Sequence, residues 1–301
     1  MTEPDASPRR RQRAVSRAAG RHRGGLDDAF SGTVEALGAL AYDGAKVSAS
    51  VVDTSTGHAV LAIDDRVVLP VAGVGRLLLL IEVAAQLEEG ALHGDRLQRM
   101  ARDTATGPGL WQFLQEPTLQ VSDLATLVGA TADAWATNAL LSTVGIDAVR
   151  VRAEGLGIDR SAVIDRVRDR RGPDDAPDSA VAAVRELSWL MRGLALGDVV
   201  DDATSNRVLG WLSLGMDMSL VAGAFGLDPL AHRALDHGLQ SVAVTGSGPG
   251  VRSETGVLRG PERSVSYAVS VSFDDATMHQ RLAVIDALRA MGADILDAVH
   301  A

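Results

Sequence analysis

Segments typical of β-strands occur near both ends of this 301-residue chain, and segments typical of helices fill most of the length between them. Two β-rich runs at 46–53 and 58–64 flank a short polar turn, and three more lie at 241–244, 251–258 and 264–273. Strands from the two ends of a chain can bury their apolar faces by joining one sheet. The pattern therefore predicts an α+β fold, in which an antiparallel sheet of about five strands is flanked by helices and split around an inserted all-helical subdomain.

The predicted helices are marked by apolar residues at helical spacing and by Gly, Pro or Asp at their ends. One precedes the first strand at 26–41, a strongly apolar one at 72–89 ends at Gly90, and a last one follows Asp275 and reaches Val299. We expect the helix at 72–89 to be central and buried. Further helical segments are predicted at 122–127, 132–144, 161–168, 179–196, 204–214 and 229–237. Residues 26–64 and 239–301 are assigned to a sheet subdomain, and 65–238 to a helical one.

Composition excludes several classes of protein. The chain has no cysteine, so disulfides, thiolate catalysis and Cys-ligated metals are ruled out, and no cofactor or metal is predicted. The net charge of −10 argues against a specific nucleic-acid binder. The most apolar run, at 77–81, is far shorter than the ~20 residues of a membrane-spanning helix.

The first 25 residues form a basic stretch with seven arginines and no apolar core of a signal peptide. We interpret this stretch as a disordered tail and expect a cytoplasmic protein. An alternative role for the tail is docking on an acidic protein partner. The arginines are Arg9, Arg10, Arg11, Arg13, Arg17, Arg21 and Arg23.

Three short stretches carry a resemblance to a known family. PVAGVGR at 70–76 begins the apolar helix, ADA at 132–134 lies in the helical region, and VTGS at 244–247 lies on a strand. Their order and contexts resemble the class A β-lactamase and penicillin-binding-protein family, whose motifs are S-x-x-K, S-D-N and K-T-G. The resemblance runs from about residue 26 to the C-terminus. It implies the family's serine-hydrolase fold and, more loosely, a bacterial protein linked to antibiotic response.

The resemblance also implies that the catalytic residues have been replaced. Gly73 stands where the family has its nucleophilic serine, and Arg76 stands where the family has the lysine. An arginine cannot replace that lysine as a base because it stays protonated at physiological pH. Lys46 is the only lysine of the chain. In the other two motifs the replaced positions are Ala132, Ala134 and Val244, and Asp133 is retained.

The remaining family positions point to a cleft that still binds ligands. No glutamate occurs at 165–174, where the family has its deacylating residue, although Asp169 is a possible loop acid. The resemblance implies an oxyanion hole made by the backbone N–H groups of Gly73 and Ser247. The ligand-binding residues predicted are Gly73, Asp133, Thr245, Gly246, Ser247 and Arg252. The expected occupant is a small-molecule carboxylate or a β-lactam-like compound.

Several alternatives stay open at this point. The leading hypothesis is a non-hydrolytic family member with a binding or regulatory role, and the second is an active amide or ester hydrolase that uses Ser247 or another hydroxyl, such as Ser241 or Ser253. Arg76 is expected to bind a ligand carboxylate or to form a buried salt bridge with Asp133 or Glu82. The bland interpretations are close packing for Gly73 and Gly75, a hairpin turn at 246–250, surface polarity for His232 and Asp236 on one helix, and core or cleft-wall positions for Trp111 and Trp135.

Overall fold

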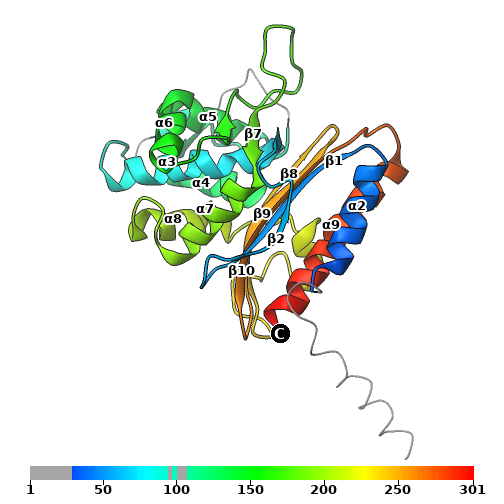
Figure 1. Ribbon diagram of the computed structural model, residues 1–301. Coiled ribbons are helices and arrows are strands. Elements are labelled where there is room, and N and C mark those ends of the chain that lie inside the picture. Colours follow the sequence, from blue (N-terminus) through cyan, green and yellow to red (C-terminus); the bar gives the residue numbers. More distant parts are fainter. Residues whose placement is uncertain (1–28, 94–96, 100–106) are drawn as a thin grey trace, which may run out of the picture.

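The computed structural model describes residues 29–93, 97–99 and 107–301, so the arginine-rich stretch lies outside the described residues. The predicted antiparallel sheet is confirmed, with five strands in the order β2-β1-β10-β9-β8, so that β1 from the start of the chain lies next to β10 from its end (Figure 1). The observed strands are β1 (Lys46–Asp53), β2 (Ala59–Ile63), β8 (Gln240–Gly248), β9 (Val251–Arg259) and β10 (Ser264–Ser272).

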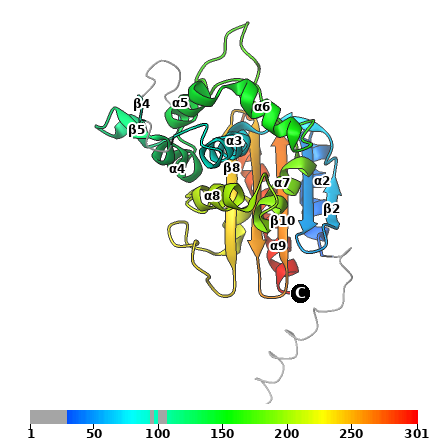
Figure 2. The same ribbon diagram turned by 90° about the vertical axis from the view of Figure 1, so that its left-hand side faces the viewer.

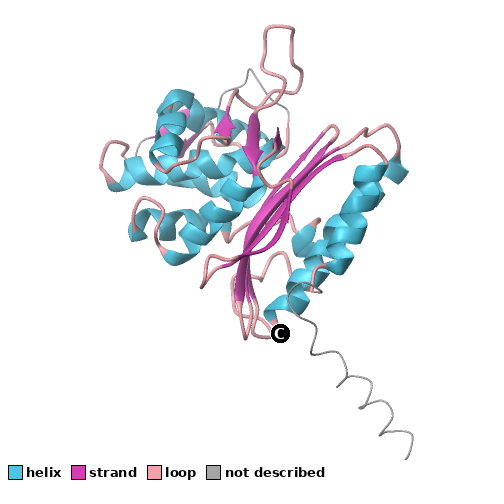
Figure 3. Ribbon diagram, viewed as in Figure 1, coloured by secondary structure: helices cyan, strands magenta, loops and turns pink. Residues whose placement is uncertain are grey.

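Both faces of this sheet are covered by helices, which form a layer on either side of the strands (Figure 3). In β1, Val47 and Val51 are buried in the core on one face, while Ser50 points to the other face and shares a hydrogen bond of 2.9 Å with Ser188 Oγ. Burial on both faces explains why the central strands lack the polar alternation of a sheet with one wet face.

The first and last helices cover one face of the sheet together. Helix α2 (Ser31–Tyr42) packs beside α9 (Met278–Val299), and a short 3₁₀ helix, η4 (Val221–Phe225), lies against α9. The backbone N–H and the Oγ1 hydroxyl of Thr33 both donate to Asp294 Oδ2, at 2.7 Å each. A carboxylate from α9 thereby satisfies a free amide in the first turn of α2.

The inserted region covers the other face (Figure 2). Its predicted central helix is confirmed as α3 (Arg76–Glu88), which follows the 3₁₀ helix η2 (Ala72–Gly75) and is buried from Arg76 to Ala85. The other helices are α4 (Val121–Thr131), α5 (Ala134–Val144), α6 (Ile146–Gly155), α7 (Val184–Leu196), α8 (Asp202–Leu212) and the 3₁₀ helix η3 (Trp111–Phe113). Short strands also occur in this mostly helical region: β3 (Val68–Pro70), β4 (Leu97–Arg99), β5 (Thr118–Gln120), β6 (Ala162–Val163) and β7 (Ala180–Ala183).

Three predicted helical segments are wrong in whole or in part. Residues 161–168 form the short strand β6 and a loop, in which Asp165 accepts hydrogen bonds from its own neighbour Arg166 N and from Arg168 and thus competes with helical bonding. The segment 179–196 begins with strand β7, which pairs with both β3 and β6, and becomes helical only at Val184. The helix α6 was not predicted.

The third wrong segment is 229–237, which consists of turns. His232 Nδ1 lies 3.1 Å from the carbonyl oxygen of Pro229, and Asp236 forms a β-bridge with Leu239. His232 and Asp236 therefore do not share a helix face, and the idea that they might act as paired metal ligands loses its basis. Among the residues that the structure describes, no helix is both long and apolar enough to cross a membrane.

Candidate functional site

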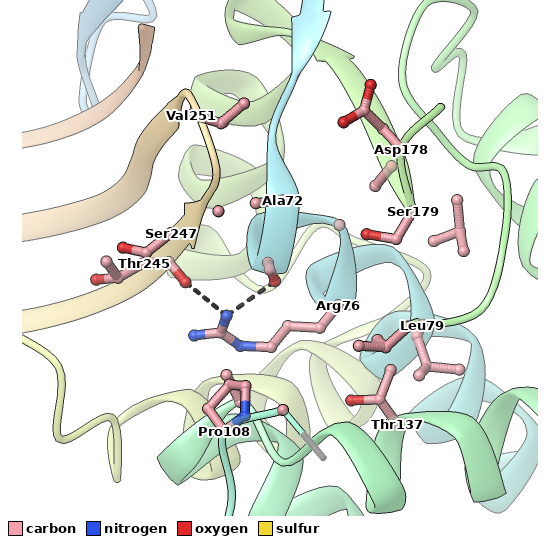
Figure 4. A pocket seen from close by; sticks show the side chains of 18 of the residues that line it. Ala72, Arg76, Leu79, Pro108, Thr137, Asp178, Ser179, Thr245, Ser247 and Val251 are labelled. Carbon is pink, nitrogen blue, oxygen red and sulfur yellow. Dashed lines mark hydrogen bonds between the residues drawn. The ribbon is translucent and has the colours of Figure 1, made fainter. Parts of the chain in front are cut away.

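A cavity of about 740 Å³ opens where the head of α3 meets the end of strand β8. The loop between β6 and β7 and the segment 215–217 form its other walls, and Gly107 and Pro108 border it near α5. In Figure 4 the side chains of Arg76, Thr245 and Ser247 lie on one side of the cavity and Ser179, Leu79 and Thr137 on the other. The cavity is thus built from both the sheet and the inserted region.

The start of α3 is packed closely against strands β8 and β7. Ser253 Oγ donates to the carbonyl oxygen of Val71 at 2.7 Å, which ties the chain before η2 to strand β9. A Cβ on Gly246 would overlap Val71, and a Cβ on Gly75 would overlap Ala180. Glycine is required at both positions because backbone or neighbouring side chains occupy the space of a side chain. This close approach brings the head of α3 to the cavity.

Arg76 is the first residue of α3 and its guanidinium lies at the head of the helix. Nη1 donates to two backbone carbonyls, Gly73 O at 2.8 Å and Thr245 O at 2.6 Å, as the dashed lines in Figure 4 show. Burial lowers the pKa of Arg76 to about 10, while the nearby charge of Asp217 acts in the opposite direction. Arg76 is therefore still cationic at neutral pH and cannot accept a proton.

Gly73 lines the cavity but leaves no space for a side chain. A Cβ built on Gly73 would lie 2.8 Å from Arg76 Nη1 and 3.3 Å from Thr245 O. The guanidinium thus occupies the position in which a side chain at residue 73 would begin. Neither salt bridge considered for Arg76 is formed, because Glu82 pairs with Arg152 at 2.7 Å and Asp133 binds backbone amides.

Asp133 is buried and does not line the cavity, although it was predicted to bind ligand. Its carboxylate caps α5 by accepting from Ala136 N at 2.9 Å, and it also accepts from Leu110 N at 2.7 Å and Trp111 N at 2.8 Å. The preceding residue, Ala132, has a left-handed backbone with φ 53° and does line the cavity, whereas Ala134 does not. Asp133 therefore fixes the loop that borders the cavity without facing into it.

On strand β8, Thr245 and Ser247 line the cavity, whereas Val244 and Gly246 do not. Arg252, also predicted to bind ligand, lies outside it. Its Nη1 donates to Gly248 O at 2.6 Å and to Val251 O at 2.7 Å, and its guanidinium lies 4.0 Å from Asp275 Oδ2. Arg252 thus stabilises the hairpin between β8 and β9.

The loop opposite the sheet carries its own charge cluster. Asp165 accepts from Arg168 Nε at 2.9 Å and Arg171 Nη1 at 2.7 Å. Partial burial opposes the charge on Asp165, but these hydrogen bonds, led by that of Arg168, lower its pKa. Asp169 lines the same cavity and is exposed, so the structure brings the possible loop acid to the cavity wall.

The hydroxyls considered as replacement nucleophiles do not have a base beside them in the described part of the chain. None of the described histidines lines the cavity, and Lys46 is exposed at the start of β1. Ser241 and Ser253 are buried outside the cavity. Trp111 is a core residue at 0% exposure, and Trp135 packs against the same core.

Sequence reasoning did not find Glu254, a fully buried acid behind the cavity wall. Glu254 accepts from Tyr267 Oη at 2.7 Å and Ala222 N at 2.9 Å, and Thr245 Oγ1 lies 3.4 Å away. Burial raises the pKa of Glu254 to about 7, even though its hydrogen bonds favour the charged form. A lone glutamate inside the otherwise neutral interior of a predicted strand was the signal available in the sequence.

The fold and the cleft between sheet and helices define a serine-hydrolase-like protein. The model of the Beta-lactamase2 family, described as the beta-lactamase enzyme family, matches residues 30–299. The chain belongs to this family. The predicted resemblance to β-lactamases is thereby confirmed.

Solved structures share the fold at low sequence identity. A beta-lactamase from Sphaerobacter thermophilus has a TM-score of 0.78 and 22% identity, with 90% of this chain and 97% of that chain covered. A beta lactamase from Xanthomonas campestris pv. campestris has a TM-score of 0.74 and 15% identity, over 91% and 98% of the two chains. PBP-A has a TM-score of 0.72 and 15% identity, over 100% and 99%. A search of curated proteins finds no match.

Proposed function

We propose that this chain is a non-hydrolytic member of the beta-lactamase family whose cleft serves to bind a small molecule. Gly73 and Arg76 stand in for the serine and lysine of the family motif in this proposal. The observation that carries it is the guanidinium of Arg76, which fills the space above Gly73 and bonds to two backbone carbonyls. No hydroxyl is available there to attack a carbonyl, and a cation cannot act as the base that activates one.

The cleft itself is retained in a form suited to binding. Its volume of about 740 Å³ is within the usual range for small-molecule sites. The backbone N–H groups of Gly73 and Ser247 line it, and donors of this kind bind carbonyl or carboxylate oxygen regardless of the side chains they carry. We take a β-lactam-like compound or another small carboxylate as the class of ligand.

A test of hydrolysis and acylation decides between this proposal and an active enzyme. The purified protein is incubated with nitrocefin and, separately, with a fluorescent penicillin, followed by mass spectrometry of the intact chain. A structure titled as an acyl-enzyme of PBP-A with penicillin-G shows that penicillin is a suitable probe for the fold. We expect no turnover above the rate without protein and no mass increase. A stoichiometric penicilloyl adduct would overturn the proposal and favour a hydrolase that uses Ser247 or another hydroxyl of the cleft.

A further inference from the structure

Arg76 carries a buried charge for which the described part of the protein supplies no ion-pair partner. The residue is only 8% exposed, and its two hydrogen bonds go to neutral carbonyl oxygens. Burying a charge without an opposite charge beside it is costly, so such groups are normally paired. The side chain is still cationic at neutral pH, because burial lowers its pKa only to about 10.

The donors of Arg76 are used unevenly. A guanidinium has five N–H donors, and the two hydrogen bonds of Arg76 are both made by Nη1. Nε is fully buried and has no acceptor, and Nη2 has none among the described residues yet is not among the fully buried atoms. The edge formed by Nε and Nη2 is the edge that binds a carboxylate with two parallel hydrogen bonds. This edge is therefore available for an anion.

The acids around the cavity do not neutralise Arg76. Asp217 lines the cavity and raises the pKa of Arg76 by its charge, but the two side chains form no ion pair. Asp165 is held on the opposite loop by Arg168 and Arg171. A charge that the protein leaves uncompensated in a cavity of this size points to a ligand as its partner.

The rest of the wall determines what accompanies the charge. Apolar side chains from four separate segments line the cavity beside Arg76: Leu79, Leu141, Val163, Val167 and Met216. The exposed wall of the cavity is mostly apolar as a result. An occupant that matches it has one anionic group at Arg76 and an apolar body that covers these side chains.

We propose that Arg76 is the anchor of a ligand site for small carboxylates with an apolar body, and that the carboxylate accepts hydrogen bonds from Nη2 and Nε. The inference rests on the proposed function, since it deepens the binding role of the same cleft. The substitution that removes the base of the family motif then also supplies the recognition group for the ligand. The ligand site lies at the helix head itself, and Arg252 takes no part in it.

The test uses two pairs of probes that differ in charge alone: acetate with acetamide, and 4-phenylbutyrate with 4-phenylbutyramide. Each is titrated into the ¹⁵N-labelled full chain, and the Arg76 Nε–H signal is followed by NMR. We expect saturable shifts of this signal with both carboxylates and at least tenfold weaker binding of each amide. We also expect 4-phenylbutyrate to bind at least tenfold more tightly than acetate, because the apolar wall adds to the anchor.

Two substitutions at the anchor and one matched control complete the design. Arg76→Met removes the charge and should weaken 4-phenylbutyrate binding at least tenfold, and Arg76→Lys, which keeps the charge without the planar fork, should fall between. Arg252→Met is the control, because Arg252 is also buried at 9% exposure and also donates from Nη1 to two backbone carbonyls, but lies outside the cavity. Its affinity should equal that of the unaltered protein.

The outcomes separate this inference from the proposed function. Carboxylate binding that is lost with Arg76→Met and kept with Arg252→Met supports the anchor. Absence of saturable shifts with either carboxylate, or equal binding of carboxylate and amide by the unaltered protein, overturns it, and the second comparison needs no variant to fold. A penicilloyl adduct would overturn the proposed function instead, whatever the carboxylate titrations give.

Discussion

At the scale of single residues, Gly73 and Arg76 restrict each other. The guanidinium reaches back over one turn to the carbonyl of Gly73 and crosses to the carbonyl of Thr245. Any side chain at residue 73 has to displace this guanidinium from two short hydrogen bonds. The sequence allowed the loss of a nucleophile and a base to be recognised separately, but only the structure shows that the two replacements depend on one another.

Gly73→Ser should therefore destabilise the protein by about 1–3 kcal/mol, as other overpacking substitutions do. Gly38→Ser is the control, because a Cβ on Gly38 of α2 meets nothing within 4 Å and should cost little or nothing. Adding Arg76→Lys to Gly73→Ser should recover part of the loss, since contacting residues are not additive. Urea unfolding of the variants measures these differences. Equal stability of Gly73→Ser and Gly38→Ser would show that the space at residue 73 is open.

The same double substitution should not restore lactam hydrolysis. Gly73→Ser with Arg76→Lys returns a hydroxyl and an amine, but Ala132, Ala134 and Val244 still lack the polar groups of the other two family motifs. We expect no nitrocefin turnover above the unaltered protein. Measurable turnover by the double variant would mean that two residues alone account for the missing chemistry.

Glu254 is a second residue whose burial predicts a measurable effect. Its pKa in the fold is about 7, against an ordinary value of 4.5, because burial disfavours the carboxylate. The folded state therefore holds its proton more tightly than the unfolded state, and stability falls as pH rises from about 4.5 to about 7. The shift corresponds to about 3 kcal/mol over this window.

Glu254→Gln should remove this part of the pH dependence. The amide keeps an oxygen that can accept from Tyr267 and has no proton to lose. The free energy of unfolding is measured by urea denaturation at pH 5 and pH 8 for the unaltered protein, Glu254→Gln and the control Glu262→Gln at an exposed site. We expect the drop between the two pH values to shrink only with Glu254→Gln. A drop of the same size in all three proteins would mean that Glu254 stays charged when buried.

At the scale of elements, the strands could be predicted well and the helical insertion less well. The five strands of the main sheet carry β-branched runs with clear turns between them, and β1 was predicted with the bounds that the structure has. In the insertion, local signals failed where tertiary pairing decides the structure. The alanine-rich start of 179–196 is a strand because β3 and β6 lie on either side of it, and nothing within the segment itself indicates those partners.

The cleft residues were predictable to a similar degree. The motif order placed Gly73, Thr245 and Ser247 at one cavity, and the structure brings them together there. It does not bring Asp133 or Arg252 into the cavity, because side-chain direction depends on caps and hairpin bonds that spacing does not reveal. Glu254 escaped notice because its environment comes from η4 and β10, which are distant from it in sequence.

The cap of α5 gives the prediction at this scale. Asp133→Ala removes a capping bond to Ala136 N and two bonds to the amides of Leu110 and Trp111, so it should cost about 2–4 kcal/mol of stability. Asp123→Ala is the control, because Asp123 is an exposed acid in the first turn of α4. Thermal melting of the two variants provides the measurement, and similar melting temperatures would contradict the structural role given to Asp133.

At the scale of the whole molecule, the sheet joins two hydrophobic cores. Adjacent residues of one strand point into different cores: Val257 into the core shared with the inserted helices and Leu258 into the core under α2 and α9. Ala268 and Val269 on β10 alternate in the same way. Neither core can lose its strands without exposing the other. We therefore predict that the sheet and helical subdomains unfold as one unit.

Asp294→Ala tests this cooperativity from the side away from the cleft. It removes both bonds to Thr33 between α9 and α2 and should cost about 1–3 kcal/mol. All four tryptophans lie in the inserted region, at 111, 135, 189 and 211, so their fluorescence reports on the distant core, whereas far-UV circular dichroism reports on every helix and strand. If the molecule unfolds as one unit, the urea midpoints of both signals shift together. A fluorescence midpoint that stays at its original value while the dichroism transition moves or splits would instead make the two subdomains independent, because the insertion would then keep its core after the outer helices had separated from the sheet.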